Sequence, residues 1–215
     1  MNIRKATHLG MCFGVRDAIE LALDQAREQP LTILADLVHN ESVLHRLRRQ
    51  GIRTVRDPQE ATTANVMVPA HDASEQAKAR VRNQGLQLTE ATCPLVHFAH
   101  RAVTNLVREG YHPVIIGKRD HVEVRGLTGD LETYDVISSE EDIFSLRERP
   151  RFGIAAQTTQ PIDRVRRLAS CLRKRFPHSE VKFIDTVCRP TKERQFAAVE
   201  LAQQADVVIV IGGAN

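Results

Sequence analysis

Short apolar runs rich in valine and isoleucine alternate along the chain with stretches of helical period. Several runs are apolar on both faces, which is typical of strands buried in a parallel sheet. They predict strands at Leu31–Ala35, Asn65–Ala70, Leu86–Thr89, Pro113–Gly117, Tyr134–Ser138, Phe152–Ala156, Val181–Asp185 and Asp206–Ile211.

The stretches between these runs predict amphipathic helices. Apolar residues three and four apart occur in Val15–Ala26, Leu95–Val107 and Ile162–Leu172. Gly110 is expected to end the second helix, and Pro161 to open the third. Strands that alternate with helices favour an α/β fold, in which helices cover parallel sheets.

A weak internal repeat divides the chain. Cys12, Cys93 and Cys188 each lie between an extended segment and the start of a helix, about one small α/β unit apart. We therefore expect three similar units around one centre. The third is expected to be incomplete, because no crossover helix follows Asp206–Ile211. The predicted boundaries are 13–92, 93–187, and 1–12 with 188–215.

Composition narrows the class of partner. The net charge is only +3 and aromatic residues make up 4% of the chain, which argues against a nucleic-acid partner. No run approaches the roughly 20 apolar residues of a membrane helix. The first residues lack the apolar core of a signal peptide. A cytoplasmic protein is therefore expected, and its four cysteines favour metal binding or catalysis over disulfides.

Three of the cysteines stand at predicted helix starts. The positive end of a helix dipole lowers the pKa of a thiol and favours the thiolate that ligates iron. No closely spaced pair of the zinc or ferredoxin type is present. Cys12, Cys93 and Cys188 instead predict an iron–sulfur cluster with one iron open to substrate. The alternative is that each is a small buried apolar residue, which is the interpretation preferred for Cys171.

A set of polar residues follows the apolar runs. The carboxyl ends of parallel strands carry ligand sites, so three histidines there suit an anionic, phosphate-like group: His39, His71 and His121. Glu123 would point to the same side as His121 in an extended segment, and is the candidate proton donor. Gln157–Thr159 adds neutral donors after another run. For each histidine the alternative is a surface or capping role.

Six motifs then resemble the LytB/IspH family of 4-hydroxy-3-methylbut-2-enyl diphosphate reductases, in the order found in that family. They are GMCFGV at 10–15, LVHN at 37–40, ATCPLV at 91–96, HVEVRG at 121–126, QTT at 157–159, and DTVC at 185–188 with TKERQ at 191–195. The resemblance implies a trefoil of three α/β units around a [4Fe–4S] cluster held by Cys12, Cys93 and Cys188.

The same resemblance implies the roles of the remaining residues. His39, His71 and His121 would hold the substrate diphosphate. Glu123 matches the acid of a proton relay, and Thr158 matches a threonine near the substrate hydroxyl. The implied reaction is a reductive dehydroxylation that yields isopentenyl and dimethylallyl diphosphates in the MEP route of isoprenoid biosynthesis. Ferredoxin or flavodoxin would donate the electrons.

The chain departs from the family pattern at several positions. Val122 stands where the family usually has proline, Asp72 where it has glycine, and Pro190 where it has alanine. A carboxylate at Asp72 would repel a diphosphate unless Lys118 or Arg119 compensates it. Two alternatives therefore stay open: a relative acting on another small anionic substrate, and a redox or binding protein without turnover. A structural zinc protein is the third alternative.

Overall fold

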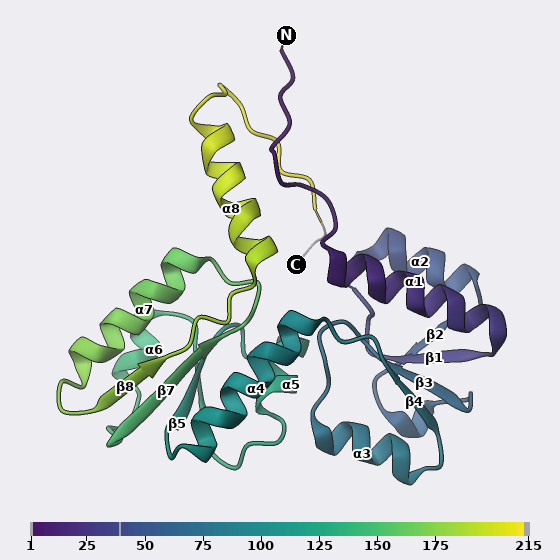
Figure 1. Cartoon of the computed structure of the whole chain (residues 1–215), viewed down its shortest axis with the longest axis horizontal. Helices are drawn as coiled ribbons and strands as arrows, with labels where there is room; N and C mark the ends of the chain where they lie inside the picture. The colour runs from purple at the N-terminus through teal and green to yellow at the C-terminus, as the bar shows by residue number, and fades with distance from the viewer. Residues whose placement is uncertain (1, 39, 213–215) are drawn as a thin grey trace. The chain divides into compact units, whose positions relative to one another are not determined.

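The structure is a computed structural model that describes residues 2–38 and 40–212. The chain divides into two compact units. The N-terminal unit comprises Met11–Val96 with Ile209–Asn215, and the C-terminal unit comprises Met1–Gly10 with His97–Val208. Each unit contains one parallel four-stranded sheet (Figure 1).

The sheet of the N-terminal unit has the strand order β2-β1-β3-β4. Its strands are β1 (Leu31–Leu34), β2 (Arg53–Val55), β3 (Asn65–Val68) and β4 (Gln87–Glu90). Its helices are α1 (Phe13–Glu28), α2 (Glu41–Arg49), the 3-10 turn η1 (Pro58–Glu60) and α3 (Glu75–Asn83). Ala18 and Ala22 of α1 pack with Leu31, Ile33 and Met67 of the sheet, so small helix residues allow α1 to approach β1 and β3 closely.

The sheet of the C-terminal unit has the order β6-β5-β7-β8. Its strands are β5 (His112–Ile116), β6 (Asp135–Ile137), β7 (Arg151–Ala156) and β8 (Glu180–Phe183). The helices after the first sheet are α4 (Pro94–Arg108), α5 (Val122–Thr128), α6 (Glu140–Phe144), α7 (Ile162–Arg175) and α8 (Arg189–Ala202). One apolar cluster joins α6 and α7 to the sheet and another joins α4 and α5 to it, so helices cover both faces.

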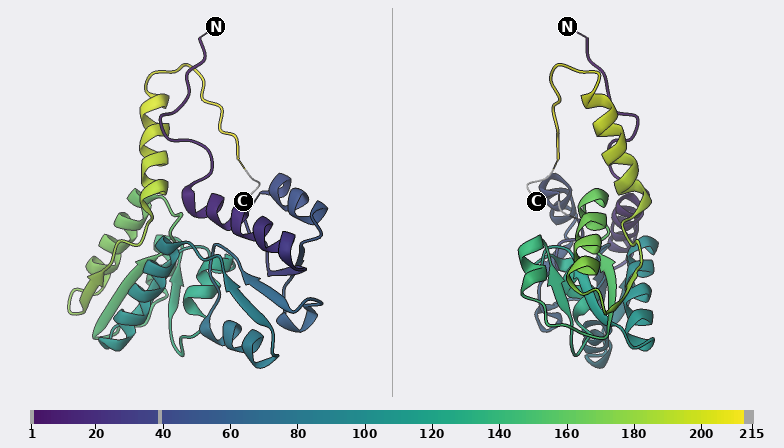
Figure 2. Two further views of the ribbon diagram at one scale, coloured as in Figure 1. Left: turned by 45° about the vertical axis from the view of Figure 1, so that its right-hand side comes forward. Right: turned by 90° about the vertical axis from the view of Figure 1, so that its left-hand side faces the viewer.

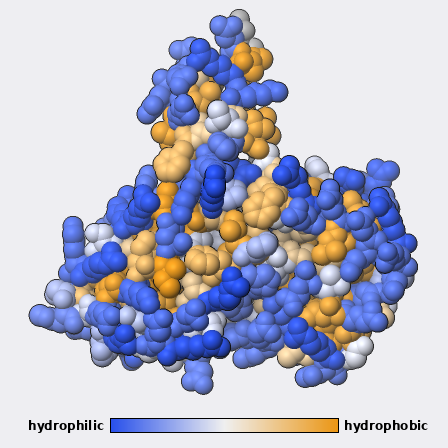
Figure 3. All heavy atoms as spheres, in the orientation of Figure 1, coloured by the Kyte–Doolittle hydropathy of each residue, from blue (hydrophilic) through white to orange (hydrophobic). Residues whose placement is uncertain are grey.

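Helix α8 extends away from the sheet of its unit, and the first residues of the chain run beside it (Figure 2). Arg194 of α8 donates to the Gly10 carbonyl at 2.8 Å, and Arg4 donates to the Gln204 side chain at 3.0 Å. Apolar side chains are exposed over this helix (Figure 3), among them Phe196 and Val199. Polar contacts therefore hold the start of the chain against α8.

The predicted α/β fold is confirmed, and the strands of the two sheets are arranged in the same order. In each sheet the second strand lies outside the first, and the fourth lies beside the third. The fourth strand leads to Cys93 and α4 in one case, and to Cys188 and α8 in the other. The division of the chain into three units stays a prediction.

Seven of the predicted strands correspond to strands of the structure, and the eighth does not. Residues 206–211 have no strand conformation, and Val207, Ile209 and Ile211 are exposed. The prediction of a strand at Asp206–Ile211 is therefore wrong, because a strand needs a hydrogen-bonded neighbour and neither described sheet includes this segment. The short strand β2, which is only partly buried, was not predicted.

The helix starts expected from sequence are confirmed where the chain is described. Gly110 has a positive φ of 81° just after α4, which ends the helix as predicted. Cys171 lies in α7 and packs against the apolar cluster of that unit, as expected for a core residue. Among the residues described, no helix combines the length and apolarity needed to cross a membrane.

Candidate functional site

A buried carboxyl group is the chemical centre of the C-terminal unit. Glu123 lies in the first turn of α5 and is 1% exposed. Thr158, in the turn after β7, donates its backbone N–H to Glu123 Oε1 at 2.6 Å and its hydroxyl to Oε2 at 2.9 Å. The first turn of α5 and the turn after β7 therefore form one acid–hydroxyl pair.

Burial changes the acidity of this carboxyl group. Loss of hydration raises the pKa of Glu123 from its ordinary value of 4.5 to about 7, although the hydrogen bonds from Thr158 act in the opposite direction. A carboxyl with this pKa holds a proton for a large part of the time near neutral pH. It has the acidity expected of a general acid.

His121 is the N-cap of α5 and not part of an extended segment. Its Nδ1 accepts the backbone N–H of Glu123 at 3.1 Å. The prediction that His121 and Glu123 lie on one side of an extended segment is therefore wrong, because the helix begins between them. Since Nδ1 is an acceptor, the neutral imidazole carries its proton on Nε2.

The third cysteine is hydrogen-bonded to the same turn. Cys188 is the N-cap of α8, and its backbone N–H donates to the Thr158 carbonyl at 2.9 Å. Its Sγ lies 3.0 Å from Thr191 Oγ1, one turn further along. Thr158 thus contacts the Glu123 carboxyl through its side chain and its N–H, and the Cys188 backbone through its carbonyl.

Neighbouring glutamines hold this turn in place. Gln157 is buried, and its Oε1 accepts the Lys118 backbone N–H at 3.1 Å and the Gln160 side chain at 3.0 Å. A Cβ on Gly117 would lie 2.8 Å from Val124 and 3.0 Å from Gln157, so only glycine allows this close approach. The loop that leads to His121 is therefore held against the turn after β7.

Two cysteines belong to the N-terminal unit. Cys12 is the N-cap of α1 and has no side-chain capping hydrogen bond. Cys93 precedes Pro94, which begins α4, and its N–H donates to the Ala70 carbonyl at 3.1 Å. A Cβ on Gly14 would overlap the Cys93 thiol and lie 2.9 Å from its Cβ, so the first turn of α1 packs directly on Cys93.

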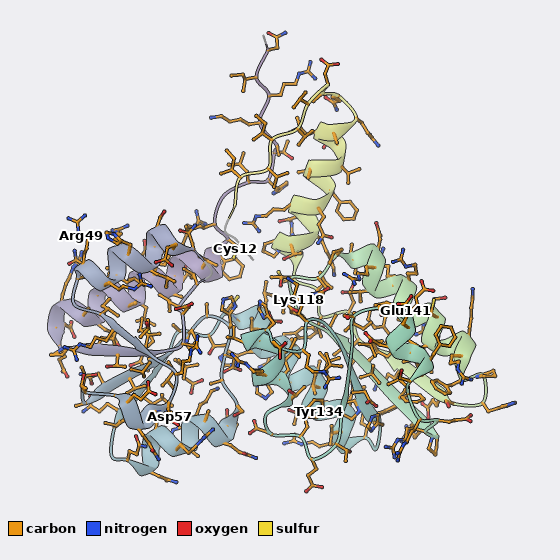
Figure 4. The ribbon with its side chains drawn as sticks, turned by 180° about the vertical axis from the view of Figure 1, so that it is seen from behind. Cys12, Arg49, Asp57, Lys118, Tyr134 and Glu141 are labelled. Carbon is orange, nitrogen blue, oxygen red and sulfur yellow. The ribbon has the colours of Figure 1, made fainter. Side chains whose placement is uncertain are left out.

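Cys12 and Cys188 have similar local surroundings at helix starts. Cys12 and Cys188 are N-caps with nearly the same backbone conformation, φ −72° and ψ 168° against φ −69° and ψ 147°. Figure 4 labels Cys12 at the start of α1. In the described part of the chain, no group of three or more potential metal ligands is gathered. The structure describes Cys12 and Cys93 in one unit and Cys188 in the other.

Within its own unit, the charge at Asp72 is compensated by a residue that the sequence analysis did not name. Lys118 and Arg119, which it did name, belong to the other unit. Lys78 Nζ lies 2.8 Å from Asp72 Oδ1, and both side chains are 2% exposed. Sequence reasoning missed Lys78, although one signal was present: it occupies the buried side of α3, three residues before Val81, where an apolar residue is expected.

The remaining residues singled out from the sequence lie in a loop after a strand or at the start of a helix, where the chain is described. His71 lies after β3, in the loop that contains Asp72, and is partly buried. Val122 is the first residue of α5, and Pro190 lies in the first turn of α8, a position that proline tolerates. His39 lies outside the described residues.

These features define a class of parallel α/β proteins that combine thiols at helix starts with a buried acid in the first turn of a helix. Over residues 3–215 the chain matches the model of the LytB protein family. The chain belongs to this family.

Named relatives and solved structures agree. The 4-hydroxy-3-methylbut-2-enyl diphosphate reductase of Geobacter metallireducens is 36% identical, over 100% of this chain and 76% of its own length. The reductase of Aquifex aeolicus is 34% identical, over 98% of this chain and 74% of its own length. A solved reductase described as the terminal enzyme of the non-mevalonate pathway has a TM-score of 0.79 at 34% identity, covering 98% of this chain and 76% of its own. The solved reductase from Plasmodium falciparum has a TM-score of 0.88 at 27% identity. The match covers 95% of this chain and 66% of that one.

Proposed function

We propose that this protein reduces 4-hydroxy-3-methylbut-2-enyl diphosphate to isopentenyl and dimethylallyl diphosphates. The carbon–oxygen bond to the hydroxyl group breaks, and a carbon–hydrogen bond forms. Two electrons and two protons are consumed, and the hydroxyl leaves as water. Membership of a family whose relatives are named for this substrate supports the proposal.

The observation that carries the proposal is the buried pair of Glu123 and Thr158. Removing a hydroxyl as water requires a proton on the departing oxygen, because hydroxide is a poor leaving group. Glu123 has a raised pKa of about 7 and therefore holds this proton near neutral pH. Thr158 Oγ1 lies 2.9 Å from Glu123 Oε2. Its hydroxyl can therefore accept the proton of the Glu123 carboxyl group while it gives its own proton to the substrate hydroxyl.

Histidines provide the complement to the diphosphate. His71 and His121 lie in loops after β3 and β5, where parallel sheets bind ligands. Capping of α5 by Nδ1 of His121 fixes the imidazole ring and places its proton on Nε2, a donor suited to a phosphate oxygen. We assign the same role to His39 from its motif.

Cys12, Cys93 and Cys188 would hold a [4Fe–4S] cluster. Their positions at the starts of α1, α4 and α8 favour the thiolate form. When bound, such a cluster supplies electrons and leaves one iron without a protein ligand. We further propose ferredoxin or flavodoxin as the electron donor and a cytoplasmic location, where thiols stay reduced.

Anaerobic turnover tests this function. Protein reconstituted with iron and sulfide is mixed with the diphosphate substrate and reduced methyl viologen, and both products are quantified. Turnover is expected in the wild type. Glu123→Gln should lower kcat by about 10²–10⁴-fold, the usual contribution of a general acid. Thr158→Ser, which keeps the hydroxyl, is the matched control and should retain most of the activity.

Two results would contradict the proposal. A brown, iron-loaded protein without turnover would favour a redox or binding protein. Stoichiometric zinc in place of iron would favour a structural metal site. Full activity of Glu123→Gln would remove Glu123 from the proton step while leaving the substrate assignment in place.

A further inference from the structure

Lys78 is a buried cation that the proposed reaction does not use. It lies on α3, and its side chain is 2% exposed. The ammonium contacts three carboxylates: Asp72 at 2.8 Å, Glu90 at 2.8 Å and Glu75 at 3.2 Å. Burial alone would lower the pKa of Lys78, but these hydrogen bonds and the Asp72 charge raise it above its ordinary value. The ammonium is therefore charged at neutral pH.

Asp72 has an unusual backbone conformation. Its φ is +69°, in the left-handed region that glycine adopts readily and other residues rarely do. Its carboxylate accepts the Ala73 N–H at 2.7 Å and the Thr92 hydroxyl at 3.3 Å. Side-chain contacts therefore hold an aspartate in a backbone conformation that carries a strain cost.

The pair connects three segments that carry or adjoin candidate site residues. Asp72 follows His71 directly, in the loop after β3. Glu90 is the last residue of β4, three residues before Cys93. Thr92, whose hydroxyl meets Asp72, immediately precedes Cys93. One ammonium thus links the loop of His71, the second turn of α3 and the segment that leads to Cys93.

We propose that Asp72 and Lys78 form a positioning pair that sets the anion affinity of the loop carrying His71. This inference rests on the proposed function, because it assigns the anion to a diphosphate. Lys78 places a positive charge 2.8 Å from the carboxylate beside His71, which weakens its repulsion of a polyanion, and it fixes the loop through Asp72. Neither residue touches reacting atoms in this proposal, so both are positioning residues.

Four proteins test the pair: the wild type, Asp72→Asn, Lys78→Met and the double variant. Lys78→Met leaves a buried carboxylate without its cation, and should raise KM for the diphosphate substrate about tenfold while kcat changes little. Asp72→Asn keeps Lys78 beside Glu90 and Glu75, and should change KM by no more than about threefold. The double variant should recover most of the KM lost in Lys78→Met, since no unpaired carboxylate remains at position 72.

Binding of inorganic pyrophosphate to the iron-free proteins, measured by calorimetry, provides a second readout. The dissociation constants should follow the same order as the KM values. Absence of turnover in the wild type would overturn the proposed function. The pyrophosphate dissociation constants of the four proteins would still test the role of Asp72 and Lys78. Failure of the wild type to bind pyrophosphate would overturn the inference.

A purely structural role for Lys78 gives a different pattern. Melting temperature would then fall in Lys78→Met and in the double variant alike, with no recovery of KM in the double variant, and that outcome would overturn the inference.

Lys78→Gln keeps a donor beside Asp72 without the charge, and replaces Lys78→Met if the latter does not fold. The matched control is Arg27→Met, which breaks an exposed pair with Asp24 on α1 and should change neither constant.

Discussion

At the scale of single residues, burial decides the chemistry of Glu123. A carboxyl on the surface would be ionised at neutral pH, whereas Glu123 is enclosed and has a pKa of about 7. Its two hydrogen bonds from Thr158 favour the ionised form but do not outweigh the loss of hydration. Glu123 is therefore protonated for much of the time near neutral pH and can act as an acid. When it ionises, the buried charge destabilises the folded protein.

This cost predicts how stability depends on pH. Below pH 4.5 Glu123 is protonated in both the folded and the unfolded protein. As pH rises from 4.5 to about 7, Glu123 ionises in the unfolded protein but not in the folded one, so the folded state loses about 3 kcal/mol from this group. In Glu123→Gln that loss should be absent. Urea denaturation of the iron-free proteins at pH 5 and pH 8 measures it, and equal pH dependence in both would contradict the assignment.

Gly14 offers a second prediction for one residue. Alanine within a helix normally stabilises a protein by about 1 kcal/mol relative to glycine. At position 14, however, the added Cβ would overlap the Cys93 thiol, so α1 or Cys93 must move. Gly14→Ala should therefore lower the melting temperature and the amount of iron bound after reconstitution. A higher melting temperature would show that the contact can relax at little cost.

At the scale of elements, candidate residues recur where a strand has ended and a helix begins. His121 begins α5, Cys188 begins α8, and Cys93 lies just before α4. Each such position lies at the positive end of a helix dipole, which stabilises thiolates and anions. The helical pattern of the sequence located α1, α4 and α7, whereas α5 was missed because seven residues are too few to show a clear period.

The capping role of His121 can be separated from its role toward the substrate. His121→Asn keeps a good N-cap and should leave the melting temperature nearly unchanged, while KM for the diphosphate rises. His121→Ala removes both functions and should also cost about 1 kcal/mol of stability. Thermal unfolding and steady-state kinetics distinguish the two effects. An unchanged KM in both variants would mean that His121 serves only as a cap.

At the scale of the whole molecule, the two sheets have the same strand order, so β4 and β8 occupy corresponding edges of their sheets. The fourth strand of each sheet runs into a cysteine and a helix. A repeat of this kind accounts for cysteines far apart in the chain having the same local surroundings. Cys93 and Cys188 thus occupy a repeated structural position, whereas Cys171 packs in a core.

Iron content tests this distinction. Cys12→Ser, Cys93→Ser and Cys188→Ser should each lose most of the iron and the visible absorption after anaerobic reconstitution, because each removes one of three proposed ligands. Cys171→Ser should retain both. Iron and sulfide analysis with absorption spectra measures the outcome. Retention of a full cluster in any of the first three variants would contradict that ligand.

The sequence by itself determined the α/β class, seven strands, the helix starts beside the cysteines and the family motifs. These features depend on residues close together in the chain, where period and capping act. Only the tertiary structure decided that Glu123 is enclosed beside Thr158, that Lys78 neutralises Asp72, and that Asp206–Ile211 is not a strand. Burial, ion pairing and strand pairing depend on partners that are distant in sequence, and local patterns do not contain them.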